Sequence, residues 1–254
     1  MIRTMEWRLV DSDLSEPEYT VAADEAIARA RSKGLVPNTL HFYRRKVPTV
    51  SMGYFQKADE ALDIDFCRRN CIRILRRASG GSAIYTDPGH LIYGLVVDEA
   101  QIPADRNEAF RKVCSAITLA LGSLGIQAEF KPANDVLVNR RKISGSAQMR
   151  RWGTVLQHGT LVLYNDIGMM TGALKMDTEK VHSRNLKPET YVTSLEETLG
   201  HAPDIQAVKS ALVDGFEKTF GVTFRKTGLT EFENELIREL TESKYGRDEW
   251  NLSR

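Results

Sequence analysis

The feature of the sequence that most constrains its fold is a central region of short strand-like runs separated by tight turns. Runs in which β-branched and aromatic residues alternate with polar ones predict strands, and they span 39–45, 49–55, 72–77, 82–86, 89–98, 127–132, 135–139, 141–151 and 155–166. Apolar residues spaced three and four apart predict helices, and these span 20–34, 63–70, 105–124, 203–220 and 230–245. Strands dominate the middle and helices the flanks. This order predicts an α+β domain with a mostly antiparallel, mixed sheet flanked by helices, because a doubly wound sheet would alternate strand and helix throughout.

The composition is that of a soluble globular protein without a strong overall charge. Among 254 residues, 35 Lys and Arg face 34 Asp and Glu, which leaves a net charge of +1. This balance predicts no binding to nucleic acid or to an anionic membrane. No apolar signal core and no run of about eighteen apolar residues occurs, so we expect a cytoplasmic protein with a single domain over residues 1–254. Cys67, Cys71 and Cys114 fit no metal or redox spacing and are expected to be reduced structural thiols.

A short glycine turn follows two arginines. Residues 79–83 read SGGSA, and Arg76 and Arg77 precede them. Glycines adopt positive φ readily and let backbone N–H groups approach a ligand, so the turn could contact a phosphate or an acyl carbonyl. It is not a P-loop, because no Lys follows the glycines and they lie between two predicted strands. The alternative is an ordinary β-hairpin turn, which Gly-Gly also favours.

Candidate charged groups gather in residues 134–160. Asp135 lies at the start of a predicted strand, where its carboxylate could bind a metal ion or a hydroxyl group. Lys142 lies beside a second turn of small residues, and its ammonium could stabilise an oxyanion or a phosphate. The alternative is that residues 140–142, which read RRK, form the solvated tip of a hairpin.

Four motifs follow one another along the chain: RRASGGSAIYTDPGHLIY, NDVLV, RKISGSAQ and QHGTLVL. Their order and spacing resemble those of the lipoate-protein ligase catalytic domain, whose fold is shared with octanoyltransferases and biotin protein ligases. The resemblance implies that ATP, with Mg²⁺, activates lipoate to lipoyl-AMP, and that the lipoyl group then passes to a lysine of a lipoyl domain. The implied acceptors are lipoyl domains of the 2-oxoacid dehydrogenase E2 type or the glycine cleavage H-protein type.

The resemblance also implies roles for single residues. Lys142 matches the catalytic lysine that contacts the acyl carbonyl and the α-phosphate, and Asp135 matches a residue near the nucleotide and its magnesium ion. The residues implied to bind the lipoyl or adenylate group are Arg77, Ser79, Gly80, Gly81, Ser82, Ala83, Tyr85, Asn134, Asp135, Ser144, Gly145, Ser146, His158, Gly159 and Thr160. Lys180, His182 and Arg184 match the position of an adenylate-binding loop. Ser82 departs from the family, because many members have a third glycine there.

Two other functions stay open beside the ligase. The related octanoyltransferases act without ATP through a Cys nucleophile, but neither KPANDV nor residues 164–185 contain a Cys. The missing thiol therefore favours a ligase over an octanoyl- or lipoyl-transferase. The third possibility is a non-catalytic lipoyl-binding subunit, against which Lys142 argues. The C-terminal accessory domain of many ligases is expected to be absent, so a separate small accessory protein would take its place.

Overall fold

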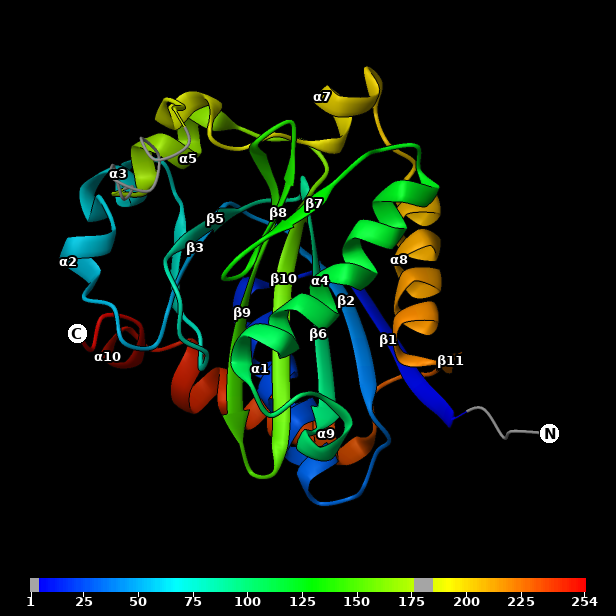
Figure 1. The fold of residues 1–254 in the computed structure, drawn as a ribbon. Helices are drawn as coiled ribbons and strands as arrows, with labels where there is room; N and C mark the ends of the chain where they lie inside the picture. Colours follow the sequence, from blue (N-terminus) through cyan, green and yellow to red (C-terminus); the bar gives the residue numbers. More distant parts are fainter. Residues whose placement is uncertain (1–4, 176–184) are drawn as a thin grey trace.

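A large mixed sheet forms the centre of the protein in the computed structural model, which describes residues 5–175 and 185–254 (Figure 1). Its strands stand in the order β11-β1-β2-β6-β10-β9-β8-β7. Their bounds are β1 (Met5–Ser15), β2 (Thr39–Arg45), β6 (His90–Asp98), β7 (Glu129–Lys131), β8 (Asp135–Val138), β9 (Arg141–Arg151), β10 (Thr154–Val162) and β11 (Val222–Lys226). Neighbouring strands from β2 to β7 are antiparallel, whereas β11, β1 and β2 run parallel. The predicted α+β class with a mostly antiparallel sheet is confirmed.

A second, three-stranded sheet carries the glycine turn. It consists of β3 (Thr49–Met52), β4 (Arg73–Arg76) and β5 (Ile84–Thr86), in the order β4-β3-β5. Strands β4 and β5 both pair with β3 and not with each other. The hairpin alternative for residues 79–83 is therefore wrong, because the turn crosses from one edge of this sheet to the other. The run at 49–55 is strand only as far as Met52.

Helices cover both faces of the large sheet. On one face lie α4 (Arg106–Ser123) and α8 (Ile205–Phe220), and on the other lie α1 (Pro17–Ser32) and α9 (Glu231–Leu240) (Figure 1). The shorter helices are α2 (Ala58–Ala61), α3 (Ile64–Arg69), α5 (Ile167–Ala173), α7 (Leu195–Leu199) and α10 (Asp248–Asn251), with single turns at Glu99–Gln101, Pro188–Thr190 and Thr241–Tyr245. Of these, α2, α3 and α5 lie around the small sheet in Figure 1.

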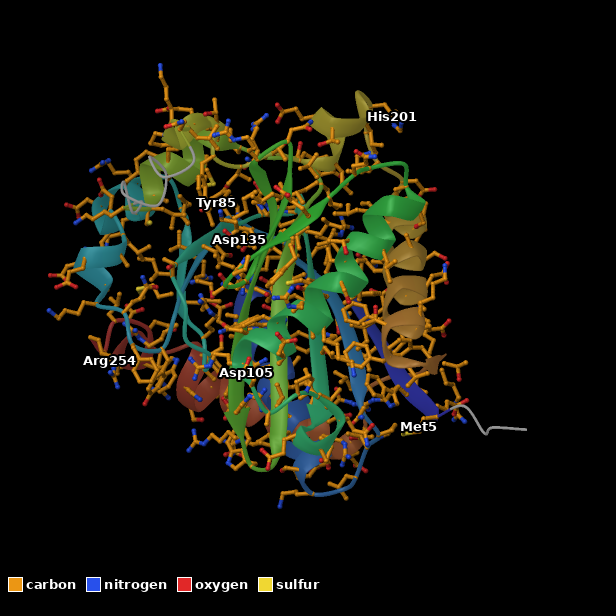
Figure 2. All side chains as sticks on the ribbon, in the orientation of Figure 1. Met5, Tyr85, Asp105, Asp135, His201 and Arg254 are labelled. Carbon is orange, nitrogen blue, oxygen red and sulfur yellow. The ribbon has the colours of Figure 1, made fainter. Side chains whose placement is uncertain are left out.

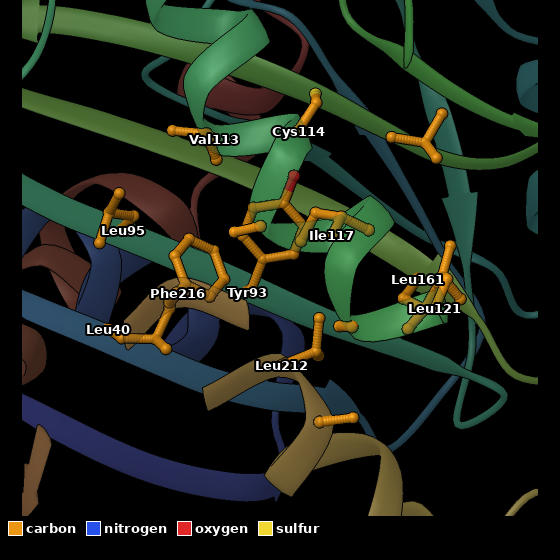
Figure 3. Packing of buried hydrophobic residues seen from close by; sticks show 14 of the residues in the cluster. Leu40, Tyr93, Leu95, Val113, Cys114, Ile117, Leu121, Leu161, Leu212 and Phe216 are labelled. Atoms are coloured by element: carbon orange, nitrogen blue, oxygen red, sulfur yellow. The ribbon is translucent and has the colours of Figure 1, made fainter. Parts of the chain in front are cut away.

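The main hydrophobic core lies between the large sheet and the α4–α8 pair. Tyr93 and Leu95 of β6 face Ile117 of α4 and Phe216 of α8 there (Figure 3). Gly215 allows the two helices to approach closely, because a Cβ at this position would lie 2.3 Å from the carbonyl oxygen of Ala116. This core holds β6 in place. β10 pairs with β6, and β9 pairs with β10, so the core also positions these two strands.

Helix α1 packs closely on the opposite face because small residues line it. Five alanines between Ala22 and Ala30 are fully buried. A Cβ at Gly94 of β6 would lie 2.7 Å from Oδ1 of Asp24, so the helix and the strand nearly touch there. Asp24 and Glu25 are themselves buried, which is unusual for carboxylates and requires partners.

Two strands lie outside the predicted set. β1 and β11 were not expected, and β11 falls in a region for which only helices were predicted. Both belong to the parallel edge of the sheet, where pairing depends on segments far apart in the sequence. No helix within residues 5–175 and 185–254 is long and apolar enough to cross a membrane.

Candidate active site

A cavity with two adjoining lobes lies between the small sheet and strands β9 and β10. The outer lobe measures about 340 Å³ and the inner lobe about 70 Å³. Both lobes share five lining residues: Ser82, Ala83, Ile84, Lys142 and Thr160. In Figure 2, Tyr85 marks the side of the small sheet and Asp135 marks β8 of the large sheet. The cavity therefore brings together the glycine turn and the two motifs of the large sheet.

The glycine turn is held from behind by Arg77. The guanidinium is buried and donates from Nε to Oγ of Ser79 at 3.0 Å. Its Nη atoms donate to the carbonyl oxygens of Ser51, Gly80 and Ser82 at 2.6, 2.7 and 2.9 Å. Burial, together with the nearby charge of Arg45, lowers the pKa of Arg77 to about 10, so the group stays cationic at neutral pH. Arg77 lines the inner lobe, and its hydrogen bonds hold the glycine turn and join it to Ser51 of β3.

Lys142 lies where the two lobes meet. Its Nζ is 2.8 Å from Oδ1 of Asp135, and its side chain is 22% exposed. A Cβ at Gly145 would lie 2.3 Å from this Nζ, so the lysine can fold over the strand only because a glycine stands there. The backbone of Lys142 also bonds to the segment at Tyr191 and Thr193. The solvated-tip alternative is therefore wrong for Lys142.

The neighbouring arginine points elsewhere. Arg141 pairs with Glu197 and donates to the carbonyl oxygens of Thr190 and Val192. Alternation along β9 separates it from Lys142, as expected for consecutive strand residues. Only Lys142 of this basic run lines the lobes.

The adjacent residues Asn134 and Asp135 have different surroundings. Asn134 lines the inner lobe and donates to the carbonyl oxygen of Ser146. Asp135 is buried, lines neither lobe and contacts Lys142 instead. Within the described parts of the chain there is no group of three or more His, Cys, Asp or Glu side chains that could hold a metal ion. A metal-binding role for Asp135 stays a prediction.

His158 belongs to a buried network that the sequence did not reveal. Its Nδ1 lies 2.9 Å from Oδ2 of Asp24, and its Nε2 lies 2.7 Å from Oγ of Ser79. Burial opposes ionisation of Asp24, but hydrogen bonds from His158 and His41 outweigh it and hold the pKa of this carboxyl well below its usual range. Asp24 was missed because it was assigned only to a helix. The signal was an acidic pair within an alanine-rich helix that has little polar face.

The other predicted residues divide between the lobes. Ser82, Ala83 and Thr160 line both, Tyr85 only the outer one, and Gly81 only the inner one; Ser144 lines the outer lobe, and Gly145, Ser146, His158 and Gly159 line the inner one. Ser79 and Gly80 line neither. Lys180, His182 and Arg184 lie outside the described residues.

The outer lobe also has an aliphatic wall that the sequence did not predict. This wall includes Val162, Met170, Leu174 and Val192.

None of the three thiols lines either lobe. Cys114 lies in the core beside Tyr93 (Figure 3), and its Sγ is 3.9 Å from Oγ of Ser146. Burial raises the pKa of Cys114 to about 12 and that of Cys67 to about 11, so both are protonated at neutral pH. Cys71 is exposed, and all three thiols are unpaired. The expectation of reduced structural thiols agrees with this arrangement.

Comparison with known proteins places the chain in a family. The model of the lipoyl protein ligase A/B catalytic domain matches residues 16–217, and the chain belongs to this family. The octanoyltransferase LipM of Geobacillus kaustophilus is 31% identical over 274 residues, covering 98% of each chain. A bi-partite lipoate protein ligase of Thermoplasma acidophilum, solved in a study with its E2 lipoyl domain, is 32% identical with a TM-score of 0.85 and covers 98% of this chain and 96% of its own. A lipoate-protein ligase A bound with ATP is 31% identical with a TM-score of 0.86, covering 98% and 99%.

The comparisons correct the predicted function. Octanoyltransferases LipM from several bacteria match nearly the whole chain, which contradicts the ATP-dependent lipoate ligase and favours the transferase alternative. The preference for a ligase over a transferase rests on the absence of a cysteine at the expected positions. That absence argues against a thiol intermediate, but it does not require ATP, because an amine can attack a thioester directly. Similar structures bind lipoate or ATP, and the enzyme class shared by all of them is a transferase or ligase of acyl groups.

Proposed function

We propose that this protein transfers an octanoyl or lipoyl group from a thioester donor to a lysine of a lipoyl domain, without ATP. The observation that carries the proposal is Lys142, held by Asp135 at the junction of two lobes. The names of the octanoyltransferase relatives support the reaction. The study of the Thermoplasma ligase with its E2 lipoyl domain supports a lipoyl domain as the acceptor.

Two lobes that meet at one cation suit a carbonyl carbon with a substituent on either side. The acyl chain would extend from the carbonyl into one lobe, and the donor arm or the acceptor lysine would approach through the other. The carbonyl oxygen would face Nζ of Lys142. Asp135 holds Nζ of Lys142 in place, because its buried carboxylate forms an ion pair with that atom at 2.8 Å.

The reaction is an aminolysis. The neutral ε-amine of the acceptor attacks the thioester carbonyl, a C–N bond forms, and negative charge develops on the carbonyl oxygen beside Lys142. Collapse of this tetrahedral species breaks the C–S bond, and the proton lost by the amine leaves with the thiol. An amide and a free thiol result. Because no thiol of the protein lines the lobes, the transfer occurs without an acyl-cysteine intermediate.

The test is transfer between purified components. The protein is incubated with an octanoyl-carrier thioester and an unmodified lipoyl domain, without ATP, and the acceptor is weighed by intact-mass spectrometry. We expect one octanoyl addition, which is retained when Cys67, Cys71 and Cys114 are all replaced by Ala. Modification only with free acid plus ATP, or only with a preformed acyl-adenylate, would refute the proposal. Binding of the acyl group without any transfer would show a non-catalytic binding subunit.

A further inference from the structure

The buried carboxylate of Asp24 lies between two similar arms. In the first, Oδ2 contacts Nδ1 of His158 at 2.9 Å, and Nε2 of His158 contacts Oγ of Ser79 at 2.7 Å. In the second, Oδ1 contacts Nδ1 of His41 at 3.1 Å, and Nε2 of His41 contacts Oγ of Ser12 at 2.9 Å. The first arm ends at the glycine turn beside the cavity. The second ends on β1, away from the lobes.

The donor and acceptor in each hydrogen bond of the first arm can be assigned, starting from Arg77. Nε of Arg77 can only donate, so Oγ of Ser79 accepts from it at 3.0 Å. The hydroxyl hydrogen of Ser79 is then available for Nε2 of His158. Nδ1 of His158 carries the remaining ring hydrogen and donates it to the Asp24 carboxylate. Each group thus fixes the orientation of the next, from Asp24 to Arg77.

The end of this arm determines how the turn presents its backbone. Arg77 binds the carbonyl oxygens of Gly80 and Ser82. In a trans peptide the N–H group points opposite to the carbonyl, so the N–H of Gly81 points away from the guanidinium. Gly81 lines the inner lobe and has a φ of 96°, which favours glycine. A small rotation of Arg77 would therefore redirect a backbone donor at the cavity.

Ser79 itself is not placed to be a nucleophile. It is 1% exposed and lines neither lobe, and its oxygen already has two partners. The arrangement of Asp, His and Ser therefore serves orientation and not covalent catalysis.

We propose that Asp24, His158 and Ser79 form a positioning relay that holds Arg77, and through it the Gly81 N–H group, for the acyl carbonyl oxygen in the inner lobe. The identity of the reaction rests on the proposed function, but the relay acts on whichever activated acyl group the cavity binds. Its members are positioning residues, because they act through Arg77 and the turn.

The experiment compares Ser79→Ala with Ser12→Ala, the matched serine at the end of the other arm. We expect Ser79→Ala to lower kcat by roughly ten- to a hundredfold, the scale of a small misplacement at a reacting centre. KM for the acyl donor should change by less than about threefold, because the interaction of the Gly81 N–H group with the carbonyl oxygen acts mainly in the transition state. Ser12→Ala should keep kcat within about twofold of the unaltered protein. Ser79→Thr, which keeps the hydroxyl group, should recover most of the rate.

A second readout follows the structure without turnover. NMR exchange of the Arg77 Nε hydrogen should accelerate in Ser79→Ala and stay slow in Ser12→Ala. Equal kcat losses in the two variants, or unchanged kcat and exchange in Ser79→Ala, would overturn the relay. Thioester and acyl-adenylate donors are both assayed. If only the adenylate supports transfer, the proposed function fails, and the relay is judged by the kcat ratio with that donor.

Discussion

Lys142 and Arg141 are adjacent in the sequence but have different surroundings. Arg141 binds Glu197 and the backbone carbonyl groups of a neighbouring segment, whereas Lys142 pairs with a buried carboxylate at the cavity. Alternation along a strand predicts that the two side chains point to opposite faces. It does not predict that Gly145 clears the space for Lys142, because that contact depends on how the strand curves.

Replacing Lys142 with Ala should lower the transfer rate by about a hundred- to a thousandfold, the scale of losing an oxyanion-stabilising group. The free energy of unfolding should also fall by about 1–3 kcal/mol, because Asp135 would lose this ion pair while it stays buried. Urea unfolding and transfer kinetics measure the two effects separately.

Controls separate catalysis from folding at this position. Lys142→Ala combined with Asp135→Asn should recover much of the stability and none of the rate. Arg141→Ala should leave the rate within about threefold of the unaltered protein, as expected when a surface contact is lost. An equal loss of rate in the Arg141 and Lys142 variants would show that the catalytic cation is wrongly assigned.

At the scale of elements, the glycine turn depends on the end of β3. A Cβ at Gly53 would lie 1.9 Å from the carbonyl oxygen of Gly81, a backbone atom that cannot swing aside. The next residue, Tyr54, donates its N–H to the carbonyl oxygen of Ser79 at 2.8 Å. The turn is therefore clamped from β3 as well as from Arg77.

Gly53→Ala should push the turn away from β3. We expect the free energy of unfolding to fall by about 1–3 kcal/mol through overpacking, and the transfer rate to fall at least about tenfold through displacement of the turn. Gly122→Ala in α4 is the matched control. Nothing lies within 4 Å of its added Cβ, so stability should stay constant or rise by up to about 1 kcal/mol, with unchanged rate. Retention of full activity by Gly53→Ala would show that the turn's position is not critical.

Local patterns predicted most elements, and long-range pairing explains what they missed. The run at 141–151 matches β9 (Arg141–Arg151), and 105–124 matches α4 within one residue at each end. In contrast, β11 pairs with β1 across most of the chain, and only its first residue is buried. Asp24 was missed for a related reason, since its partners His41 and His158 come from two distant strands.

At the scale of the whole molecule, buried carboxylates connect helices to distant segments. Glu233 of α9 binds the guanidinium of Arg8 on β1 at 2.5 and 2.9 Å. Glu25 of α1 binds Lys244 and Tyr245 near the C-terminal end at 2.6 and 2.5 Å. Such pairs add little net stability when formed, but removal of one partner leaves a buried charge without compensation.

These carboxylates predict how stability depends on pH. Burial raises the pKa values of Glu233, Glu25 and Asp24, but their hydrogen bonds and ion pairs outweigh it, so each pKa lies below its unfolded value of about 4 to 4.5. A group with a lowered pKa in the folded state contributes stability above its unfolded pKa and loses it as pH falls through the folded pKa. Urea unfolding should therefore show constant stability between pH 7 and about pH 5, and a steep loss below about pH 4.5.

Replacing Glu233 with Gln tests the buried pair. Glu233→Gln should lower the free energy of unfolding by about 3–5 kcal/mol at pH 7, because Arg8 stays buried, and should make the loss of stability in acid shallower. Glu60→Gln, which alters an exposed pair with Lys57, should leave both the stability at pH 7 and the acid slope unchanged. If Glu233→Gln kept the acid slope of the unaltered protein, the buried pair would not be a source of the pH dependence.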